Sequence, residues 1–139
     1  MTRAMGLDLG TKTIGIALSD PMYWIAQAHG TIQRKSLPED IDALRKIIEE
    51  YEVEEIILGL PLNMNHTYGP SAQRAKTFGA QLEQLLRKSV IYQDERLSTV
   101  SADRVLIESG VRREHRKKHV DSVAATFILQ TWLDGRKRK

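Results

Sequence analysis

The sequence predicts a single α/β domain in which helices cover a mixed β-sheet. Three observations lead to this fold class. Two alternating stretches near the amino terminus have the pattern of a β-hairpin, and short apolar strands then alternate with amphipathic helices. The length of 139 residues is enough for one domain with a substantial core and too short for two ordinary domains. An antiparallel start followed by alternating helices and strands is typical of a mixed sheet.

The predicted hairpin comprises residues 5–10 and 14–19. In both stretches the apolar residues occupy alternate positions, so each strand has one apolar face and one face of small residues. The turn at residues 10–13 connects the two strands. A third strand is expected over residues 28–33.

The next elements alternate between helix and strand. Ser36 and Glu39 have the spacing of a capping box and predict the start of a helix. Its apolar residues recur at helical spacing, at Ile41, Leu44, Ile48 and Tyr51. Residues 55–59 form a short apolar run, which predicts a parallel strand buried on both faces. Residues 60–70 are expected to form a loop.

Two strand and helix repeats complete the predicted domain. The second helix should have an apolar stripe made of Ala75, Phe78, Leu82 and Leu85. Residues 90–92 predict another strand, and residues 98–108 predict a third helix. A final helix is expected from about residue 119 to residue 133, ending at Gly135.

The composition excludes several classes of protein. With 41% hydrophobic and 28% charged residues, the chain resembles a soluble globular domain and not a disordered one. No apolar run approaches the ~18 residues that a membrane helix needs. The first six residues lack a signal-peptide pattern, so a cytoplasmic location is expected. The absence of cysteine excludes disulfides, thiolate metal sites and cysteine nucleophiles.

The net charge of +3 conceals an uneven distribution. Residues 112–119 contain five basic and one acidic residue, and residues 136–139 are all basic. The remaining 127 residues carry twelve basic and seventeen acidic residues. An acidic body with concentrated basic segments indicates a polyanionic partner such as nucleic acid. The same charges are also compatible with a solvated loop and a solubilising tail.

Three acidic positions are candidates for chemistry. Asp8 lies within an apolar strand, where a carboxylate is costly unless it is paired, hydrogen-bonded or metal-bound. Asp94 and Glu95 follow a predicted parallel strand, where open α/β sheets place their sites, and alternation should turn only one toward Asp8. Asp121 shares a stripe of the final helix with Ala125 and should face the sheet. Each acid alone also fits a capping or surface role.

If these acids converge, they favour a particular kind of site. Carboxylates without cysteine or a histidine pair are typical ligands of Mg²⁺ or Mn²⁺. Carboxylates around one or two such ions are typical of enzymes that hydrolyse phosphodiester bonds. The basic segment before Asp121 would bring phosphate to such a site. We interpret His115 and His119 as phosphate contacts or surface residues and not as metal ligands.

Four blocks of the sequence resemble one bacterial family. The blocks are residues 8–17, residues 59–64, residues 94–99, and Lys117-Lys118 followed by Asp121 and Ala124-Ala125. In this order and spacing they are similar to the RuvX family, also called YqgF. Its members are described as pre-16S ribosomal RNA nucleases and, earlier, as Holliday-junction resolvases.

The resemblance implies an RNase H-like fold related to RuvC, with a five-stranded mixed sheet flanked by helices over residues 1–139. It implies a divalent-metal nuclease in which Asp8, Glu95 and Asp121 are the catalytic and metal-binding acids and Mg²⁺ or Mn²⁺ is the cofactor. Asp94 is a family-typical neighbour whose role the motif does not separate from that of Glu95. Seven basic residues are candidate nucleic-acid contacts: Lys12, Arg96, Arg112, Arg113, Arg116, Lys117 and Lys118.

Several alternatives stay open at this point. The first block also resembles the phosphate loop of actin-like and sugar-kinase ATPases, although these enclose ATP between two related domains. A nucleic-acid-binding protein without catalysis would share the fold and the basic segment, but it would not need the three acids. Among nuclease functions, maturation of the pre-16S RNA 5′ end and resolution of branched DNA are both compatible with the sequence.

Overall fold

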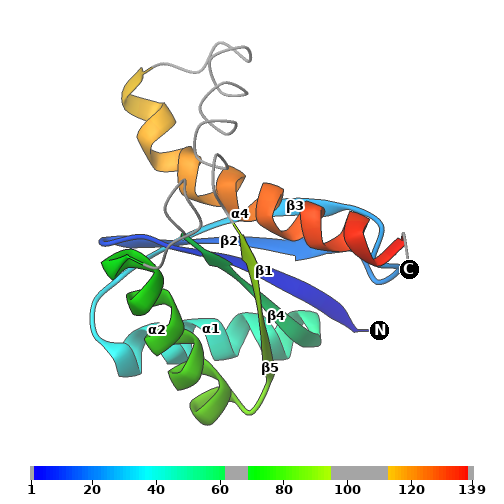
Figure 1. The fold of residues 1–139 in the computed structure, drawn as a ribbon, viewed down its shortest axis with the longest axis horizontal. Coiled ribbons are helices and arrows are strands. Elements are labelled where there is room, and N and C mark those ends of the chain that lie inside the picture. The colour runs from blue at the N-terminus through cyan, green and yellow to red at the C-terminus, as the bar shows by residue number, and fades with distance from the viewer. Residues whose placement is uncertain (1, 62–68, 95–112, 138–139) are drawn as a thin grey trace.

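The computed structural model of the chain describes residues 2–61, 69–94 and 113–137, and the side chains of residues 122–136 in the last of these ranges. In these ranges a five-stranded sheet lies between two helices on one face and a long helix on the other (Figure 1). The elements are β1 Arg3–Leu9, β2 Thr13–Ser19, β3 Ala26–Gln33, α1 Leu37–Tyr51, β4 Val53–Leu60, α2 Pro70–Leu86, β5 Ser89–Asp94 and α4 Arg113–Lys137.

The sheet has the strand order β3-β2-β1-β4-β5, with β1 at its centre. β1 pairs with β2 in antiparallel orientation, which confirms the predicted hairpin. β4 pairs in parallel with β1 on one side and with β5 on the other. β3 adds an antiparallel edge strand that begins at Ala26, two residues before the predicted start, because Ala26 still pairs with Ser19. The prediction of a mixed sheet flanked by helices is therefore confirmed.

α1 begins where the spacing of Ser36 and Glu39 predicts, with Ser36 as the N-cap residue. The backbone N–H of Glu39 donates to the Ser36 hydroxyl oxygen at 3.3 Å, and this hydroxyl lies 3.2 Å from the Glu39 carboxylate. Ile41, Leu44 and Ile48 are buried against the sheet, as their spacing predicts. The cap therefore fixes where α1 begins, and the apolar stripe fixes which face it buries.

The apolar stripe of α2 differs from the prediction at its last position. Ala75, Phe78 and Leu82 are buried as expected, but Leu85 is 44% exposed. Leu86 packs against the core instead. It follows Leu82 by four residues, which brings it closer to the buried face than the three-residue step to Leu85 does.

The final helix is longer than the sequence predicts. α4 begins at Arg113, six residues before the expected start, where Arg, Glu and Lys are good helix formers. It also continues through Gly135, which does not adopt a positive φ and so does not end the helix. Beyond this glycine, the Arg136 guanidinium carbon lies 4.9 Å from the centre of the Trp132 ring, one turn earlier. The third predicted helix lies outside the described residues.

The connection between β2 and β3 is organised by the Asp20 carboxylate. It accepts hydrogen bonds from the backbone N–H groups of Trp24 at 2.7 Å, Ile25 at 2.9 Å and Met22 at 3.2 Å. These donors, the Ile25 N–H first, hold the pKa of Asp20 below its usual value. The connection is thereby fixed in a shape that can contact α4.

Gln130 joins this connection to α4. Its side-chain oxygen accepts the Ala26 N–H at 2.8 Å, and its side-chain nitrogen donates to the Trp24 carbonyl at 3.1 Å. Arg136 adds a second contact, because its guanidinium carbon lies 4.7 Å from the centre of the Tyr23 ring. The carboxyl-terminal half of α4 is thus anchored to the edge of the sheet.

The two faces of the sheet differ in side-chain size. On the face covered by α1 and α2, the strands contribute mainly large aliphatic residues, including Met5, Leu7, Ile14, Ile16, Ile56 and Leu58. On the face covered by α4, the strands contribute mainly alanines, and α4 supplies most of the larger side chains: Ala4, Ala17, Ala26 and Ile57 meet Ala125, Ile128, Leu129 and Leu133. α4 can therefore approach the sheet more closely than a helix on a leucine-rich face could.

Gly6 is the point where α4 and β1 come closest. A Cβ atom at this position would lie 2.7 Å from the Cβ of Leu129 and 2.9 Å from the carbonyl oxygen of Ala125. Both atoms belong to a buried, regular helix and cannot move aside independently. Gly6 is therefore required by packing.

None of the helices in the described ranges combines the length and the apolarity that a bilayer crossing demands.

Replacing Gly6 by alanine should destabilise the protein by about 1–3 kcal/mol, because the added methyl group pushes α4 away from β1. Gly135→Ala is the matched control, since a Cβ atom there meets nothing within 4 Å. In that helical position alanine should raise stability by up to about 1 kcal/mol. Urea unfolding measures both effects. Equal midpoints for the two variants would show that the close approach is not needed.

Candidate functional site

Asp8 lies near the carboxyl end of the central strand, on the face that α4 covers. Alternation along β1 places it on the same face as Ala4 and Gly6, both of which lie under α4. The residue is 8% exposed, and its partner across the hairpin is Gly15. The residue opposite this largely buried carboxylate therefore has no side chain.

The path of α4 brings position 121 toward the same end of β1. The carboxyl-terminal part of α4 lies over the start of β1, and the helix runs back across the sheet in the opposite direction to the strand (Figure 1). From the contact between Gly6 and Ala125, two residues along β1 lead to Asp8, a step of about 7 Å. One turn back along α4 leads to Asp121, a step of about 6 Å in the same sense.

The end of β5 bears on whether Asp94 or Glu95 is the partner of Asp8, which the sequence pattern leaves open. Asp94 pairs with Leu60, and Tyr92 pairs with Leu58. Leu60 and Tyr92 pack against α2, so Asp94 belongs to the face opposite Asp8. Gln93 is on the Asp8 face, because Ile91, two residues earlier, pairs with Ile57 under α4. The position of Asp94 thus disfavours it as a partner of Asp8.

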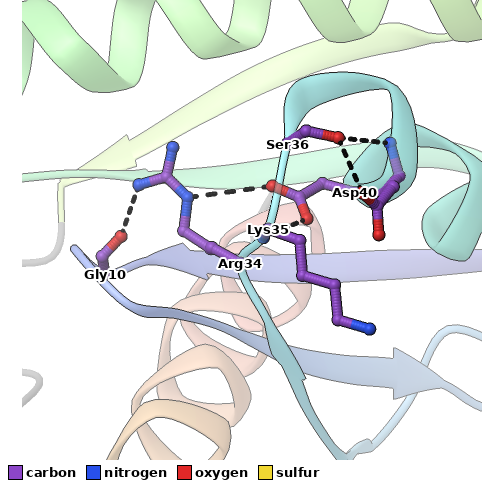
Figure 2. A network of polar contacts seen from close by, with 6 residues as sticks. Gly10, Arg34, Lys35, Ser36 and Asp40 are labelled. Carbon is purple, nitrogen blue, oxygen red and sulfur yellow. Dashed lines mark hydrogen bonds and ion pairs between the residues drawn. The ribbon is translucent and has the colours of Figure 1, made fainter.

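The turn between β1 and β2 carries Lys12 and is supported by Arg34, which is not among the residues that the sequence predicts for the site. Lys12 is exposed, and its carbonyl oxygen accepts the Arg34 N–H at 2.8 Å. The Arg34 side chain donates to the Gly10 carbonyl at 2.7 Å (Figure 2). No motif or periodicity in the sequence points to Arg34, since its role depends on the pairing of β2 with β3.

Comparison with known proteins identifies the family. Residues 2–135 match the family described as "RuvX: Holliday junction resolvase". The chain belongs to the RuvX family. The prediction made from the four sequence blocks is therefore confirmed.

Close relatives of this RuvX chain have nuclease names. A protein of Syntrophomonas wolfei named "Putative pre-16S rRNA nuclease" is 52% identical over 133 residues, which cover 96% of this chain and 94% of that protein. A protein of Moorella thermoacetica with the same name is 49% identical over 132 residues, covering 95% and 94% of the two chains. The chain is thus similar along nearly its whole length to proteins named as nucleases.

The fold of the RuvX chain is also that of solved resolvases. The Fowlpox virus resolvase, determined in a complex with Holliday junction DNA, superimposes with a TM-score of 0.60 at 12% identity, covering 96% of this chain and 98% of that one. The RuvC protein of T. thermophilus, also in complex with a Holliday junction, gives a TM-score of 0.55 at 12% identity, covering 99% and 96%. These likenesses confirm the RuvC-like, RNase H-like fold that the resemblance implied.

Several candidate site residues of this RuvX chain have no described side chain. Glu95, Arg96 and Arg112 lie outside the described residues. For five further candidates in the first part of α4, the structure describes the backbone but not the side chain: Arg113, Arg116, Lys117, Lys118 and Asp121. Among the side chains that are described, no three histidine or acidic residues gather closely enough to hold a metal ion. Of the three candidate ligands, Asp8 is the one whose side chain is described.

Proposed function

We propose that this chain is a divalent-metal-dependent nuclease that acts on pre-16S ribosomal RNA, in the maturation of its 5′ end. The observation that carries the proposal is the placement of Asp8, a largely buried carboxylate beside small residues at the carboxyl end of the central strand. The relatives named as pre-16S rRNA nucleases support this substrate over branched DNA.

Three acids would form the site. Asp8 is the acid of the central strand, and Asp121 is the acid of the helix that crosses the same face. Glu95 is the third, and the placement of Asp94 on the opposite face favours Glu95 over its neighbour. Each acid would bind the cation and hold it against the scissile phosphate.

The chemistry of these donors fits a hard cation. Carboxylate oxygens are the preferred protein ligands of Mg²⁺ and Mn²⁺, and Gly15 opposite Asp8 places no side chain beside the Asp8 carboxylate. When bound, such a cation supplies an activated water molecule and stabilises the leaving oxygen of a phosphodiester. The chain itself would provide the negative charge that retains the cation. The largely buried Asp8 carboxylate would fix the position of this cation.

Resolution of Holliday junctions is the second candidate function. The description of the family and the fold shared with two resolvases favour it. Incubation with pre-16S RNA and with a four-way junction, each with Mn²⁺ or with a chelator, distinguishes the two functions. We expect metal-dependent cleavage of the RNA. Cleavage confined to the junction would replace the proposed substrate, and chelator-resistant binding without cleavage of either would indicate a non-catalytic protein.

Asp8→Asn should lower the cleavage rate by more than about a hundredfold, because it removes a charged ligand from the cation while preserving side-chain volume. Asp94→Asn is the matched control, since Asp94 lies on the other face of the sheet. It should retain cleavage near the wild-type rate. Single-turnover cleavage of the RNA gives both rates, and circular dichroism checks the fold. Full activity of the Asp8 variant would remove this residue from the mechanism.

Mn²⁺ should stabilise the wild-type protein against heat, because a cation that binds only the folded state shifts the unfolding equilibrium. At a concentration a hundred times the Kd the gain is about 2.7 kcal/mol. The Asp8→Asn variant should lose most of this gain, and the Asp94→Asn variant should keep it. Differential scanning calorimetry with Mn²⁺ and with a chelator measures the effect. Equal stabilisation of both variants would mean that the cation binds elsewhere.

Neutralising Lys117 and Lys118 should weaken RNA binding at all sequences and flatten the dependence of affinity on salt, by about one unit of slope for each phosphate that the protein no longer neutralises. The basic segment precedes Asp121, so an RNA backbone entering the site would have to pass it. Removal of residues 137–139 is the control, because Arg136 at the far end of α4 keeps its interaction with Tyr23. Titrations of each protein with RNA at several salt concentrations measure the affinity and its salt dependence. A larger decrease in affinity from the tail removal would relocate the RNA path.

A further inference from the structure

A cavity of about 770 Å³ lies on the face of the sheet opposite Asp8. Its walls come from three places: the end of β1 with the turn that follows it, the segment between β3 and α1, and the first turns of α2. The side chains that give it its character are Thr11, Arg34, Ser36, Gln73, Arg74 and Thr77. The lining is thus rich in hydrogen-bond donors and includes two guanidinium groups.

The Arg34 guanidinium is fixed in place at one side of this cavity. One terminal nitrogen donates to the Gly10 carbonyl at 2.7 Å, and Nε lies 4.0 Å from the Asp40 carboxylate. Its central carbon lies 6.0 Å from the centre of the buried Phe78 ring. Figure 2 shows the remaining terminal nitrogen pointing away from both Gly10 and Asp40. The charge is therefore held rigidly, with a donor left over for a ligand.

Asp40 does not cancel the positive charge of the cavity. It is the one acidic side chain among the described residues that line it, and it is 4% exposed. Its carboxylate accepts the Lys35 backbone N–H at 3.0 Å and lies near Arg34, as Figure 2 shows. Asp40 thus serves to hold Arg34 in place. Arg74, which donates to the Ser71 hydroxyl at 2.9 Å and is exposed on α2, adds a second guanidinium group to the lining.

The cavity and the Asp8 face meet at the turn between β1 and β2. Leu9 lines the cavity, and the preceding residue, Asp8, points to the other side of the sheet. Thr11 in the turn also lines the cavity, and the next residue is the exposed Lys12. A strand of nucleic acid that leaves Asp8 therefore reaches the cavity by crossing one turn that carries a lysine.

We propose that this cavity binds the phosphate backbone of the substrate strand beyond the site of cleavage. The inference rests on the proposed nuclease function, and it assigns Arg74 and Arg34 to substrate binding on the side of the sheet away from the acids. Guanidinium groups and hydroxyls are typical phosphate donors, whereas the aromatic ring of the lining, Phe78, is only 4% exposed and offers no stacking platform for a base. The cavity therefore contacts backbone and not bases.

Two pairs of variants on exposed helical positions test this proposal. Arg74→Gln removes a cation from the cavity, and Lys46→Gln removes one from α1 outside it. Gln73→Glu adds an acid to the cavity, and Gln84→Glu adds one near the other end of α2, also outside it. Within each pair the change in net charge is the same, so a difference in binding reports on position.

Fluorescence anisotropy with a long single-stranded RNA, in the presence of a chelator, measures binding without cleavage. Arg74→Gln and Gln73→Glu should each weaken binding by roughly fivefold, and Arg74→Gln should reduce the salt slope by about one unit. Lys46→Gln and Gln84→Glu should leave the affinity close to that of the wild type.

Other results would overturn the proposal. Equal decreases in affinity within each pair would mean that only net charge matters. Competition by inorganic phosphate or a nucleoside monophosphate that disappears in Arg74→Gln, with long RNA unaffected, would show a site for a small anion instead. If the wild type cleaves no RNA but the cavity variants still weaken its binding, the nuclease function fails and the cavity assignment stands.

Discussion

The close approach of α4 to β1 at Gly6 is the constraint on which the rest of this structure depends. With no side chain at Gly6, the carbonyl of Ala125 and the Cβ of Leu129 can lie directly over the central strand. That contact sets the height of the helix above the sheet and its register along the strand. It thereby determines which part of α4 passes the end of β1 where Asp8 lies. The alanines around it extend the same close packing to β2 and β3.

The two faces of the sheet have different roles: one contributes most of the hydrophobic core, and the other carries the candidate site residue Asp8. The α1 and α2 face holds most of the large aliphatic core and therefore most of the hydrophobic stabilisation. The α4 face is packed through small residues and carries Asp8. At the carboxyl end of β1 consecutive residues serve the two faces in turn, with Asp8 on one side and Leu9 on the other. A nuclease with this arrangement can hold a polyanion on both sides of its sheet.

Features set by neighbours in sequence can be predicted, and features set by distant packing cannot. The hairpin follows from alternation in β1 and β2, and the start of α1 follows from Ser36 and Glu39, because both patterns are local. The prediction for Leu85 is wrong because a stripe does not specify how far the core extends along α2. Gly135 does not end α4, since the next residue, Arg136, contacts Trp132 of the same helix. Arg136 also contacts Tyr23, which lies in the β2–β3 connection, distant in sequence. Asp8 is a candidate because its carboxylate lies within an apolar strand, whereas Arg34 depends on contacts with Gly10 and Asp40 that no sequence pattern encodes.

The position of α4 in the chain has a consequence for synthesis on the ribosome. β1, β2 and β3 are the first strands to emerge, yet the helix that covers one face of them begins 80 residues after the end of β3. Until then Ala4, Ala17 and Ile57 lack the α4 residues that they pack against in the folded protein. The parallel pairing of β1 with β4 is a further contact between segments distant in sequence, and such contacts slow folding. The nascent chain therefore cannot complete its fold before α4 leaves the exit tunnel, and a message truncated before this helix would yield a sheet with an open, aggregation-prone face.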